Sequence, residues 1–350
     1  GWERMDEVPT DEGNHLISCA ADKDWETPLG HIYTGYYAVM AQKYWQVFGK
    51  QEESFRRTLA EISVKHHGYA RFNPYAQAPM DITVDDVLNS PVVAYPLRAL
   101  DCCLMSVGAA CAIICDEPTA MELTKNTKNK PLRIWVSAGS HTLRPACRRD
   151  MEIPLLPNES PDQYADMAEK FPGGDRYPGF TGFLGARMAA YYGYHMAGIV
   201  DPTEDLDVIE LHDAFTISDV QSYEDVGIRP YGYGRDYVES GDCYHTNPHT
   251  GEPGKLPSNL SGGLLGCMHA VGATGIMQTL EIASHIWNRW AEIHEDPKIW
   301  EEFGREKPAD WTDLQVKDAK RALAISHAGV GSHVTATILM DPDHLLKEDA

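Results

Sequence analysis

The sequence predicts an α/β protein, because short apolar strand candidates alternate with amphipathic helix candidates along its length. Residues 206–211 form an apolar strand candidate that ends on His212, and residues 216–224 then follow a helical pattern. Residues 322–326 and 333–340 are two further strand candidates, joined by a short glycine-containing loop, which predicts a hairpin. A chain of 350 residues can bury a large core and should form two domains or one large one.

Composition and charge indicate an ordinary globular protein. Hydrophobic residues make up 43% of the chain, and no apolar run approaches the ~20 residues that a membrane span requires. The 52 acidic residues exceed the 30 Lys and Arg residues and give a net charge of −22. Such a surface repels nucleic acid and anionic membranes. The eight cysteines form neither a CxxC pair nor a regular secreted framework, which favours a reducing cytoplasm.

The N-terminal third mixes helical patterns with polar turns and short apolar runs. Residues 37–47 and 55–66 each place apolar side chains on one helix face, and residues 83–86 have the spacing of a helix capping box. Residues 108–115 are predicted to be a strand that is buried on both faces. Residues 118–131 are interpreted as a surface helix end followed by a linker.

The remainder of the chain begins with a strand candidate at residues 132–137. Residues 181–199 form a helix candidate rich in small side chains, which permits close packing of its neighbours. A longer helical pattern follows a glycine-rich stretch near residue 275, and its apolar side chains recur at alternating four- and three-residue steps. The side chains expected on its apolar face are Ile276, Leu280, Ala283, Trp287 and Trp290.

The glycine-rich stretch, residues 256–275, contains a single histidine, His269, just before the predicted helix. A glycine-rich loop that leads into a helix N-terminus presents backbone N–H groups and a dipole that favour negative charge. An imidazole in such a loop suggests oxyanion stabilisation or general base catalysis. The alternative is that the glycines only allow close helix packing and that His269 is a core residue.

Three histidines share one feature, because each lies at the end of a strand candidate or in a glycine loop. His212 follows a strand, His269 precedes the long helix, and His327 opens the hairpin turn. In α/β proteins, ligands bind at the carboxyl ends of strands. Three imidazoles there could supply a general base, an oxyanion donor and a proton donor. Each histidine alone could equally be a core or surface residue.

Three segments resemble the active-site motifs of the thiolase superfamily. They are His-Asp-Ala-Phe at residues 212–215, the glycine-rich residues 261–275 around His269, and His-Ala-Gly-Val-Gly at residues 327–331. Further segments that resemble the archaeal and sterol-carrier-type branch are residues 1–5, 64–67, 73–77 and 100–102. The resemblance implies the thiolase α/β fold, with five αβαβα layers built from two similar βαβαβαββ halves. It also implies that the first half is incomplete, because the family's nucleophilic cysteine and first strands precede the segment at residue 1.

The resemblance assigns roles to the three histidines. His269 is similar to the histidine that activates the nucleophilic cysteine and helps form the first oxyanion hole. His212 is similar to the residue that holds the water of that oxyanion hole, and His327 matches the position of the acid/base cysteine. Ala214 stands where sterol-carrier-type enzymes have a second candidate acid/base cysteine, which leaves His327 for that role.

The resemblance also assigns loop and substrate-binding positions. Gly329, Gly331 and Gly266 are expected in the oxyanion-binding loops, whereas Ser261, Gly262 and Phe215 are expected to bind substrate. The loop around His269 departs from the family's Gly-His-Pro pattern, since Met268 and Ala270 flank the histidine. Cys267 is a rival nucleophile within the chain, although its context differs from that of the family's cysteine.

The function implied by the resemblance is CoA-dependent thiolytic cleavage of a 3-oxoacyl-CoA, or the reverse Claisen condensation. Acyl-CoA and CoA would be substrates, with no bound cofactor and no metal. A cytoplasmic homodimer is expected, and a small zinc-ribbon/OB-fold protein is a possible partner. The alternatives are a thiolase-like retro-aldol lyase acting on acyl-CoA, and a non-catalytic scaffold or lipid-transfer subunit.

The predicted domain organisation follows from the same resemblance. Residues 1–90 would hold the thiolase loop region and part of the N-terminal half, residues 91–130 the end of that half, and residues 131–350 the C-terminal half with all three histidine motifs. Tyrosines and phenylalanines concentrated in residues 177–194 and 223–244 could line a pocket for a bulky acyl group. Ordinary core and loop packing is the alternative for these aromatic residues.

Overall fold

A four-stranded mixed sheet forms the centre of the molecule. The computed structural model describes residues 1–20, 22, 24–26, 28, 32–48, 51–140, 153–164 and 179–346. The strand order is β5 (Arg133–Ser140), β8 (His333–Met340), β7 (Arg321–Ala328) and β6 (Val208–Glu210). β7 and β8 form an antiparallel hairpin, β5 pairs antiparallel with β8, and β6 runs parallel to β7. The strands predicted at residues 132–137, 206–211, 322–326 and 333–340 and the hairpin are confirmed, and His327 lies within β7 near its end.

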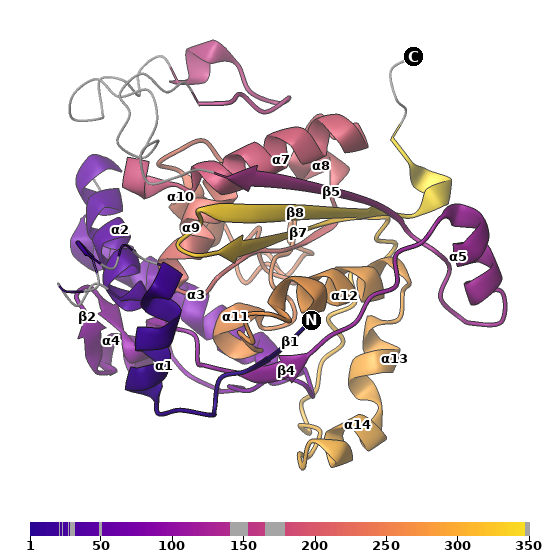
Figure 1. Cartoon of the computed structure of the whole chain (residues 1–350), viewed down its shortest axis with the longest axis horizontal. Coiled ribbons are helices and arrows are strands. Elements are labelled where there is room, and N and C mark those ends of the chain that lie inside the picture. Colours follow the sequence, from indigo (N-terminus) through magenta and orange to yellow (C-terminus); the bar gives the residue numbers. More distant parts are fainter. Residues whose placement is uncertain are drawn as a thin grey trace.

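Helices cover both faces of this sheet (Figure 1). α7 (Leu184–Ala197) lies on one face, and α12 (Thr274–Ile286) with the short α11 (Gly263–Gly266) lies on the other. α7 approaches the sheet closely because glycines meet there: a Cβ at Gly139 would lie 1.9 Å from the carbonyl oxygen of Gly185. The small residues of the predicted helix at 181–199 therefore serve close packing, as the sequence indicates.

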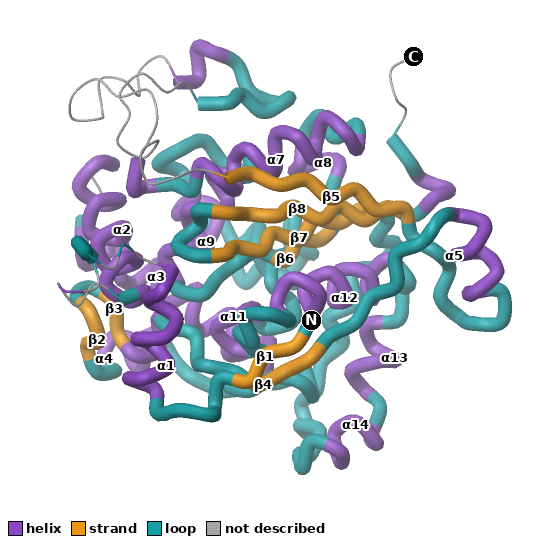
Figure 2. The backbone as a smooth tube through the Cα atoms, viewed as in Figure 1, coloured by secondary structure: helices purple, strands orange, loops and turns teal. Residues whose placement is uncertain are grey.

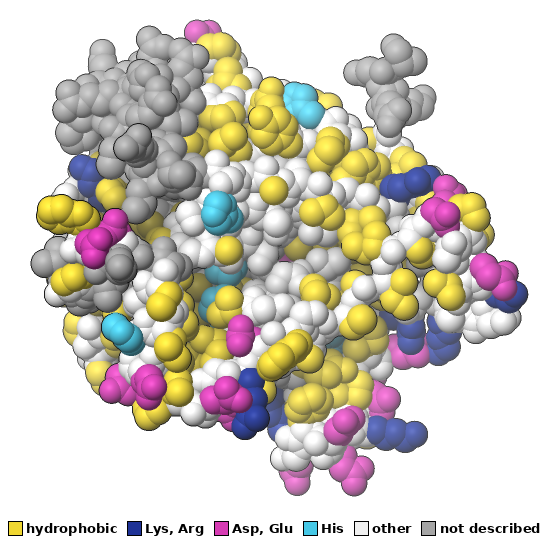
Figure 3. Space-filling model, in the orientation of Figure 1, with side chains coloured by type: hydrophobic (Ala, Val, Ile, Leu, Met, Phe, Trp, Pro, Cys, Tyr) yellow, Lys and Arg dark blue, Asp and Glu magenta, His cyan; other side chains and the backbone are white. Residues whose placement is uncertain are grey.

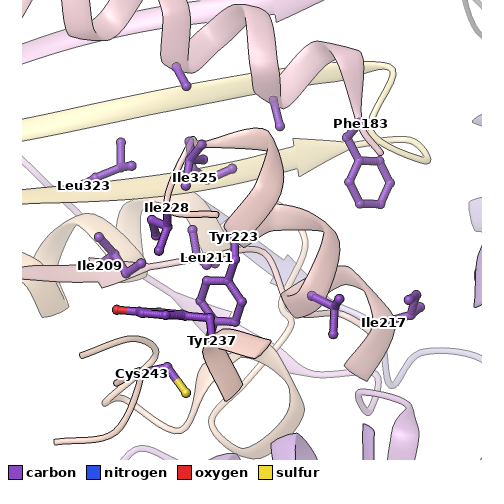
Figure 4. Packing of buried hydrophobic residues seen from close by; sticks show 14 of the residues in the cluster. Phe183, Ile209, Leu211, Ile217, Tyr223, Ile228, Tyr237, Cys243, Leu323 and Ile325 are labelled. Carbon is purple, nitrogen blue, oxygen red and sulfur yellow. The ribbon is translucent and has the colours of Figure 1, made fainter. Parts of the chain in front are cut away.

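Most of the buried apolar side chains form one cluster between the sheet and the helices that follow it. Figure 4 shows Ile209, Leu323 and Ile325 of the strands, and Leu211 directly after β6, near Tyr223 of α9 (Thr216–Asp225). These side chains are fully buried. Because β6 and β7 are covered on both sides, their apolar runs are those of a buried parallel pair. Both strands are therefore held firmly at the edge where His212 and His327 emerge.

A second, much smaller sheet lies beyond α11 and α12. It consists of β1 (Trp2–Arg4) paired antiparallel with β4 (Val107–Ala109). Figure 1 shows it on the side of α12 that faces away from the four-stranded sheet, so the described elements stack as helices, sheet, helices and ladder. We call this pair the N-terminal ladder. The α/β class is confirmed, and a further two-stranded sheet is formed by β2 (Val92–Ala94) and β3 (Leu97–Arg98).

The predicted buried strand at residues 108–115 is wrong. Only its first residues belong to β4, and the residues after it have no regular secondary structure. Ile113 and Ile114 are 78% and 70% exposed. An apolar run predicts burial only when other elements pack on both faces of the strand, and no described element does so here.

The predicted apolar face of the helix after residue 275 is also partly wrong. Leu280 is 37% exposed, and the helix ends before Trp290, which begins α13 (Trp290–Glu295). The buried face of α12 instead carries polar residues such as Gln278 and Glu281. Periodicity located the helix but misjudged which face packs, because Gln278 and Glu281 form hydrogen bonds with partners inside the protein.

The remaining elements complete the frame around the site (Figure 2). The helices predicted at residues 37–47 and 55–66 are confirmed as α2 (Tyr33–Phe48) and α3 (Glu52–Ala70). The other elements are α1 (Thr10–Ile17), α4 (Val84–Asn89), α5 (Glu117–Thr124), α8 (Pro202–Asp205), α10 (Gly234–Glu239), α14 (Pro297–Glu302), β2 (Val92–Ala94) and β3 (Leu97–Arg98). The predicted capping box is present, since the Thr83 side chain accepts from the backbone of Asp86. None of the described helices is long and apolar enough to cross a membrane.

Candidate active site

The three predicted histidines meet at one point. The rings of His212 and His327 are stacked, with centroids 4.7 Å apart and planes 14° from parallel. The ring of His269 stands edge-on to His212, with centroids 5.0 Å apart. His212 and His327 come together because they follow or end the parallel strands β6 and β7. Histidine side chains gather along the middle of the face shown in Figure 3.

The position of His212 relative to β7 is set by a hydrogen bond. The backbone N–H of His327 donates to Nδ1 of His212 over 3.2 Å. Phe183 packs edge-on against His327 from the other side, with ring centroids 4.8 Å apart. Both ring nitrogens of His327 are buried and, among the described residues, have no hydrogen-bond partner. Buried polar atoms are nearly always paired, so this imidazole is the part of the site most in need of a ligand.

The loop carrying His269 is held by residues from the N-terminal third of the chain. The backbone N–H of His269 donates to Oγ of Ser106 over 2.9 Å, and the Cys267 carbonyl accepts from the N–H of Gln77 over 2.6 Å. The hydroxyl of Ser106 in turn donates to the side chain of Gln77. Gly266 passes so close to α3 that a Cβ would lie 2.6 Å from the carbonyl oxygen of His66. Sequence reasoning missed Ser106, because no local pattern marks a long-range backbone contact.

Asp213, directly after His212, neutralises the start of α11. Its carboxylate accepts from the N–H groups of Leu264 over 2.8 Å and Leu265 over 3.3 Å, and from Nδ2 of Asn259 over 2.7 Å. The carboxylate thus binds backbone N–H groups inside the glycine-rich stretch, whereas the anion site expected at the start of the long helix after it stays a prediction. Gly263 is required at this point, because it has φ +62° and a Cβ there would lie 2.2 Å from Oδ2 of Asp213.

Behind Asp213 lies a buried histidine between two aspartates, His66, which the sequence did not predict. Nδ1 of His66 is 2.6 Å from Oδ2 of Asp213, and its Nε2 is 3.4 Å from Asp219. All three side chains are fully buried. Burial opposes a charge on His66, but the two aspartates on either side raise its pKa above the ordinary value. His66 thereby ties α3 to the loops that carry His212 and His269.

All three site histidines are held neutral near pH 7. Burial lowers the pKa of His269 to about 4, and burial together with the nearby His269 lowers the pKa of His327 to about 3. Burial, with His327 and His269 beside it, keeps the pKa of His212 well below its ordinary value. A neutral imidazole has one N–H donor and one lone pair. Each ring of the cluster can therefore accept a proton at its lone pair and donate a hydrogen bond from its N–H at neutral pH.

The other residues predicted for the site include two glycines of the turn after β7 and Phe215. Gly329 and Gly331 form the turn after β7 with φ +61° and +69°, and a Cβ at Gly331 would lie 2.4 Å from Phe183. Phe215 is buried and stacks on Tyr37 with ring centroids 4.2 Å apart. The oxyanion-loop assignments stay predictions.

Ser261 and Gly262 lie inside the glycine loop. Ser261 is fully buried, and its hydroxyl donates to Glu210 over 2.8 Å. Gly262, with φ +97°, packs against Ala70, where a Cβ would come within 2.8 Å of the alanine methyl. Both positions support the loop from within, and their assignment to substrate binding, like that of Phe215, stays a prediction.

The described cysteines near the site do not resemble a reactive nucleophile. Cys267 is buried against Ala70 and Ala76, and Asn73 donates to its sulfur over 3.4 Å. Burial, then the carboxylates of nearby acidic residues, hold the pKa of its thiol well above the ordinary value. Burial also raises the pKa of Cys103 to about 12. Since the thiolate is the attacking form, these thiols are poorly suited to attack a thioester.

Metal ligation has no candidate group in the described part of the chain. No set of three or more His, Cys, Asp or Glu side chains lies close enough together there to hold an ion.

Two cavities lie away from the histidine cluster. The larger of the two, of about 720 Å³, lies near α13 and α14 and includes Tyr75 and Arg289 in its lining. A second cavity of about 480 Å³ borders Met188 on α7. Neither cavity is lined by a site histidine. The histidine cluster is therefore chosen as the candidate site because of its three adjacent imidazoles and not because of a cavity.

The fold and the three histidine motifs define a thiolase-type protein, and the chain belongs to the thiolase superfamily. The model of the thiolase C-terminal domain-like family matches residues 175–295. An acetyl-CoA acetyltransferase of Methanothermobacter thermautotrophicus is 34% identical over 284 residues, which are 81% of this chain and 61% of that protein. The benzoylsuccinyl-CoA thiolase subunit BbsB of Thauera aromatica is 30% identical over 291 residues, or 81% of this chain and 64% of that one. The chain thus spans less than two thirds of the length of these relatives.

The fold is also that of a solved structure of modest sequence similarity. The Ltp2-ChsH2(DUF35) aldolase matches 97% of this chain and 69% of its own, with a TM-score of 0.62 and 19% identity. At this identity the likeness concerns the fold alone. It places enzymes of different reaction types on the same architecture, so the reaction must be argued from the site.

Proposed function

We propose that this chain supplies the acid/base and oxyanion-binding groups of a thiolase-type enzyme acting on acyl-CoA. The reaction would be CoA-dependent cleavage of a 3-oxoacyl-CoA, or the reverse Claisen condensation. The observation that carries the proposal is the meeting of three neutral imidazoles, His212, His269 and His327, at the ends of two parallel strands. The acetyltransferase and thiolase relatives support the same reaction class.

Each imidazole has a task in this reaction. His269 takes the proton from the nucleophilic thiol, whose thiolate adds to the 3-oxo carbon of the substrate. The bond between the second and third carbons then breaks, and its electron pair passes to the departing acyl-CoA as an enolate. His327 gives a proton to that carbon, and His212 donates a hydrogen bond to a developing oxyanion. The thiol of free CoA then gives its proton to His327, and its sulfur takes the acyl group. His269 returns its proton to the departing enzyme thiolate, which restores the thiol and both histidines.

The nucleophilic thiolate is the one group that the described site does not provide. Cys267 is buried and has a raised pKa, and Cys103 has a pKa of about 12. We assign the thiolate to a group outside the described residues, and we expect a further polypeptide segment or another chain to supply it. The experiment is to incubate this chain alone, and the whole natural protein, with an acyl-CoA and to measure intact and peptide masses. An adduct only on the whole protein supports the assignment, and an acyl adduct on Cys267 overturns it.

A second candidate reaction is retro-aldol cleavage of an acyl-CoA. It is favoured by the pairing of a neutral base with an N–H donor at a site where no described thiol is reactive. Such a reaction needs no covalent intermediate and no free CoA. The two reactions are separated by offering the protein a 3-oxoacyl-CoA with CoA, and separately an acyl-CoA with a tertiary 3-hydroxyl group. Cleavage of only the second substrate would replace thiolysis by the retro-aldol reaction.

The assembly is part of the proposal as well. We place the protein in the cytoplasm as a homodimer, with a small zinc-ribbon/OB-fold protein as a candidate partner. The name of the solved aldolase, which includes a DUF35 component, supports a partner of this kind. Light scattering of the purified protein, alone and after co-purification with proteins of its source cell, measures both points. A monodisperse monomer without bound protein would contradict them.

A further inference from the structure

The hydrogen bonds around His212 determine which of its nitrogens carries the proton. A backbone N–H can only donate, so Nδ1 of His212 must accept the bond from His327. The ring is neutral near pH 7, because burial and the two neighbouring imidazoles keep its pKa low. A neutral ring that accepts at Nδ1 carries its proton on Nε2. His212 is therefore a hydrogen-bond donor at the site.

The hydroxyl group of Thr274 binds His269, and its second hydrogen bond determines which of the two groups donates the proton. Oγ1 of Thr274 lies 3.0 Å from Nδ1 of His269 and 3.0 Å from the carbonyl oxygen of Ala270. A hydroxyl has one proton to donate and can accept two hydrogen bonds. Both bonds form only if Thr274 donates to Ala270 and accepts from Nδ1–H of His269. If Thr274 donated to His269 instead, the bond to the carbonyl would be lost.

We propose that Thr274 is a positioning residue that holds His269 in the Nδ1–H tautomer, so that Nε2 keeps its lone pair and acts as the base. This rests on the proposed function, which needs a base at His269. With His212 in the opposite tautomer, the two adjacent rings offer one acceptor and one donor at the same point. The complementary pair arises from backbone and hydroxyl contacts outside the reacting groups.

The place of Thr274 in the fold suits this task. It is the first residue of α12, is 1% exposed, and lies five residues after His269 at the end of the glycine loop. The bend of the loop brings the imidazole back onto the start of the helix. The start of α12 is well anchored, because Gln278 one turn later donates to the carbonyl of Leu211 just before His212. The helix thus sets the orientation of His269 relative to His212.

The chain contains a matched control for removing this hydroxyl. Thr279 on the same helix donates to the carbonyl of Gly275 over 2.8 Å, four residues earlier, as Thr274 does to Ala270. Its hydroxyl has no histidine contact among the described residues. Thr279→Val therefore removes the same helix hydrogen bond without touching the site. Thr274→Val keeps the volume of the side chain but loses the hydroxyl, and Thr274→Ser keeps the hydroxyl.

The first experiment is ¹⁵N NMR of the full chain with labelled histidine, with the His269 signals assigned by their loss in His269→Gln. In the wild type we expect Nδ1 protonated and Nε2 unprotonated at pH 7. Thr274→Val should give a mixture of tautomers, whereas Thr274→Ser and Thr279→Val should keep the wild-type pattern. A wild-type His269 with its proton on Nε2 overturns the proposal, even if Thr274→Val fails to fold. This measurement needs no turnover, so it stands apart from the proposed reaction.

The second experiment uses the whole natural protein in the cleavage assay. Thr274→Val should lower kcat by roughly 10- to 100-fold with little change in KM, because a base in the wrong tautomer affects the proton transfer and not substrate binding. Thr274→Ser should restore the rate, and Thr279→Val should behave as wild type. Equal losses in Thr274→Val and Thr279→Val would show that the hydroxyl matters only to the helix, and would overturn the positioning role.

Discussion

The four-stranded sheet and the N-terminal ladder differ sharply in how many contacts hold them together. The four-stranded sheet has helices on both faces and carries His212 and His327 at adjacent strands. The N-terminal ladder has only three residue pairs, and its outer side chains are open, with Trp2 73% and Val107 55% exposed. An isolated two-stranded pair is marginally stable in water. The ladder therefore depends on its contact with the rest of the protein.

The site takes parts from both regions. His212 and His327 belong to the large sheet, whereas His269 is held by Ser106, just before the first residue of β4. The ladder also packs closely against the loop before His269, since a Cβ at Gly108 would lie 2.8 Å from the terminal methyl carbon of Met268. The comparison teaches that the two stacked imidazoles are set by the core. The third imidazole is oriented by α12 through Thr274, but its backbone N–H is held by Ser106, next to the ladder.

The largest expected effect concerns the buried carboxylate at the centre of the core region. Asp213→Ala would leave Nδ1 of His66 and the N–H groups at the start of α11 without their partner. Removing one member of a buried ion pair costs about 3–5 kcal/mol. Thermal or urea unfolding should show a loss of this size. In the ladder, the exposed Trp2 replaced by Ser should change the free energy of unfolding by less than about 0.5 kcal/mol. Equal losses in the two variants would abolish the distinction between the regions.

A smaller effect is expected from the contact that joins the ladder to the site. Ser106→Ala removes the acceptor of the His269 N–H, and an unpaired buried group costs about 1–3 kcal/mol. The loss should appear mainly in catalysis, as roughly a 10-fold fall in kcat/KM, because His269 moves relative to His212. Ser90, whose hydroxyl bonds the Val87 carbonyl at the end of α4, serves as the control. A Ser90→Ala variant that loses as much activity would argue against a specific role for Ser106.

The pH dependence of the reaction should reflect the low pKa that burial gives to His269. A base with its pKa near 4 is unprotonated from about pH 6 upward, so kcat/KM should fall only as the pH drops towards 4. The contribution of His269 to the free energy of unfolding should also fall as the pH drops from about 6.5 to about 4. In that range the unfolded chain binds a proton at this histidine, whereas the folded protein does not. His66, whose pKa is raised, contributes in the opposite sense. An acid limb near 6.5 that His269 substitution removes would contradict this picture.

The sequence located the three clustered histidines well, because strand ends and glycine loops are local features. His212, His269 and His327 were expected at one site and are found there. The supporting contacts were beyond sequence reasoning. His66 and Ser106 act through residues more than a hundred positions away, and a helical or strand pattern carries no information about such partners.

The misjudged elements have the same cause. Residues 108–115 are apolar enough for a buried strand, yet burial depends on what packs against them. The face of α12 was misassigned because Gln278 and Glu281 are buried with polar partners such as Leu211 O and the Trp290 indole N–H. Hydrophobic periodicity identifies an element with more certainty than it identifies the face that the element buries.

The most direct test of the central claim is the turnover of His269→Ala in the whole natural protein. The substitution removes the proposed base and an oxyanion donor together, so cleavage of a 3-oxoacyl-CoA should slow by roughly two to four powers of ten. His269 is only half-buried and makes one side-chain hydrogen bond among the described residues, so the melting temperature should change little. A folded variant with near-normal turnover would contradict the account.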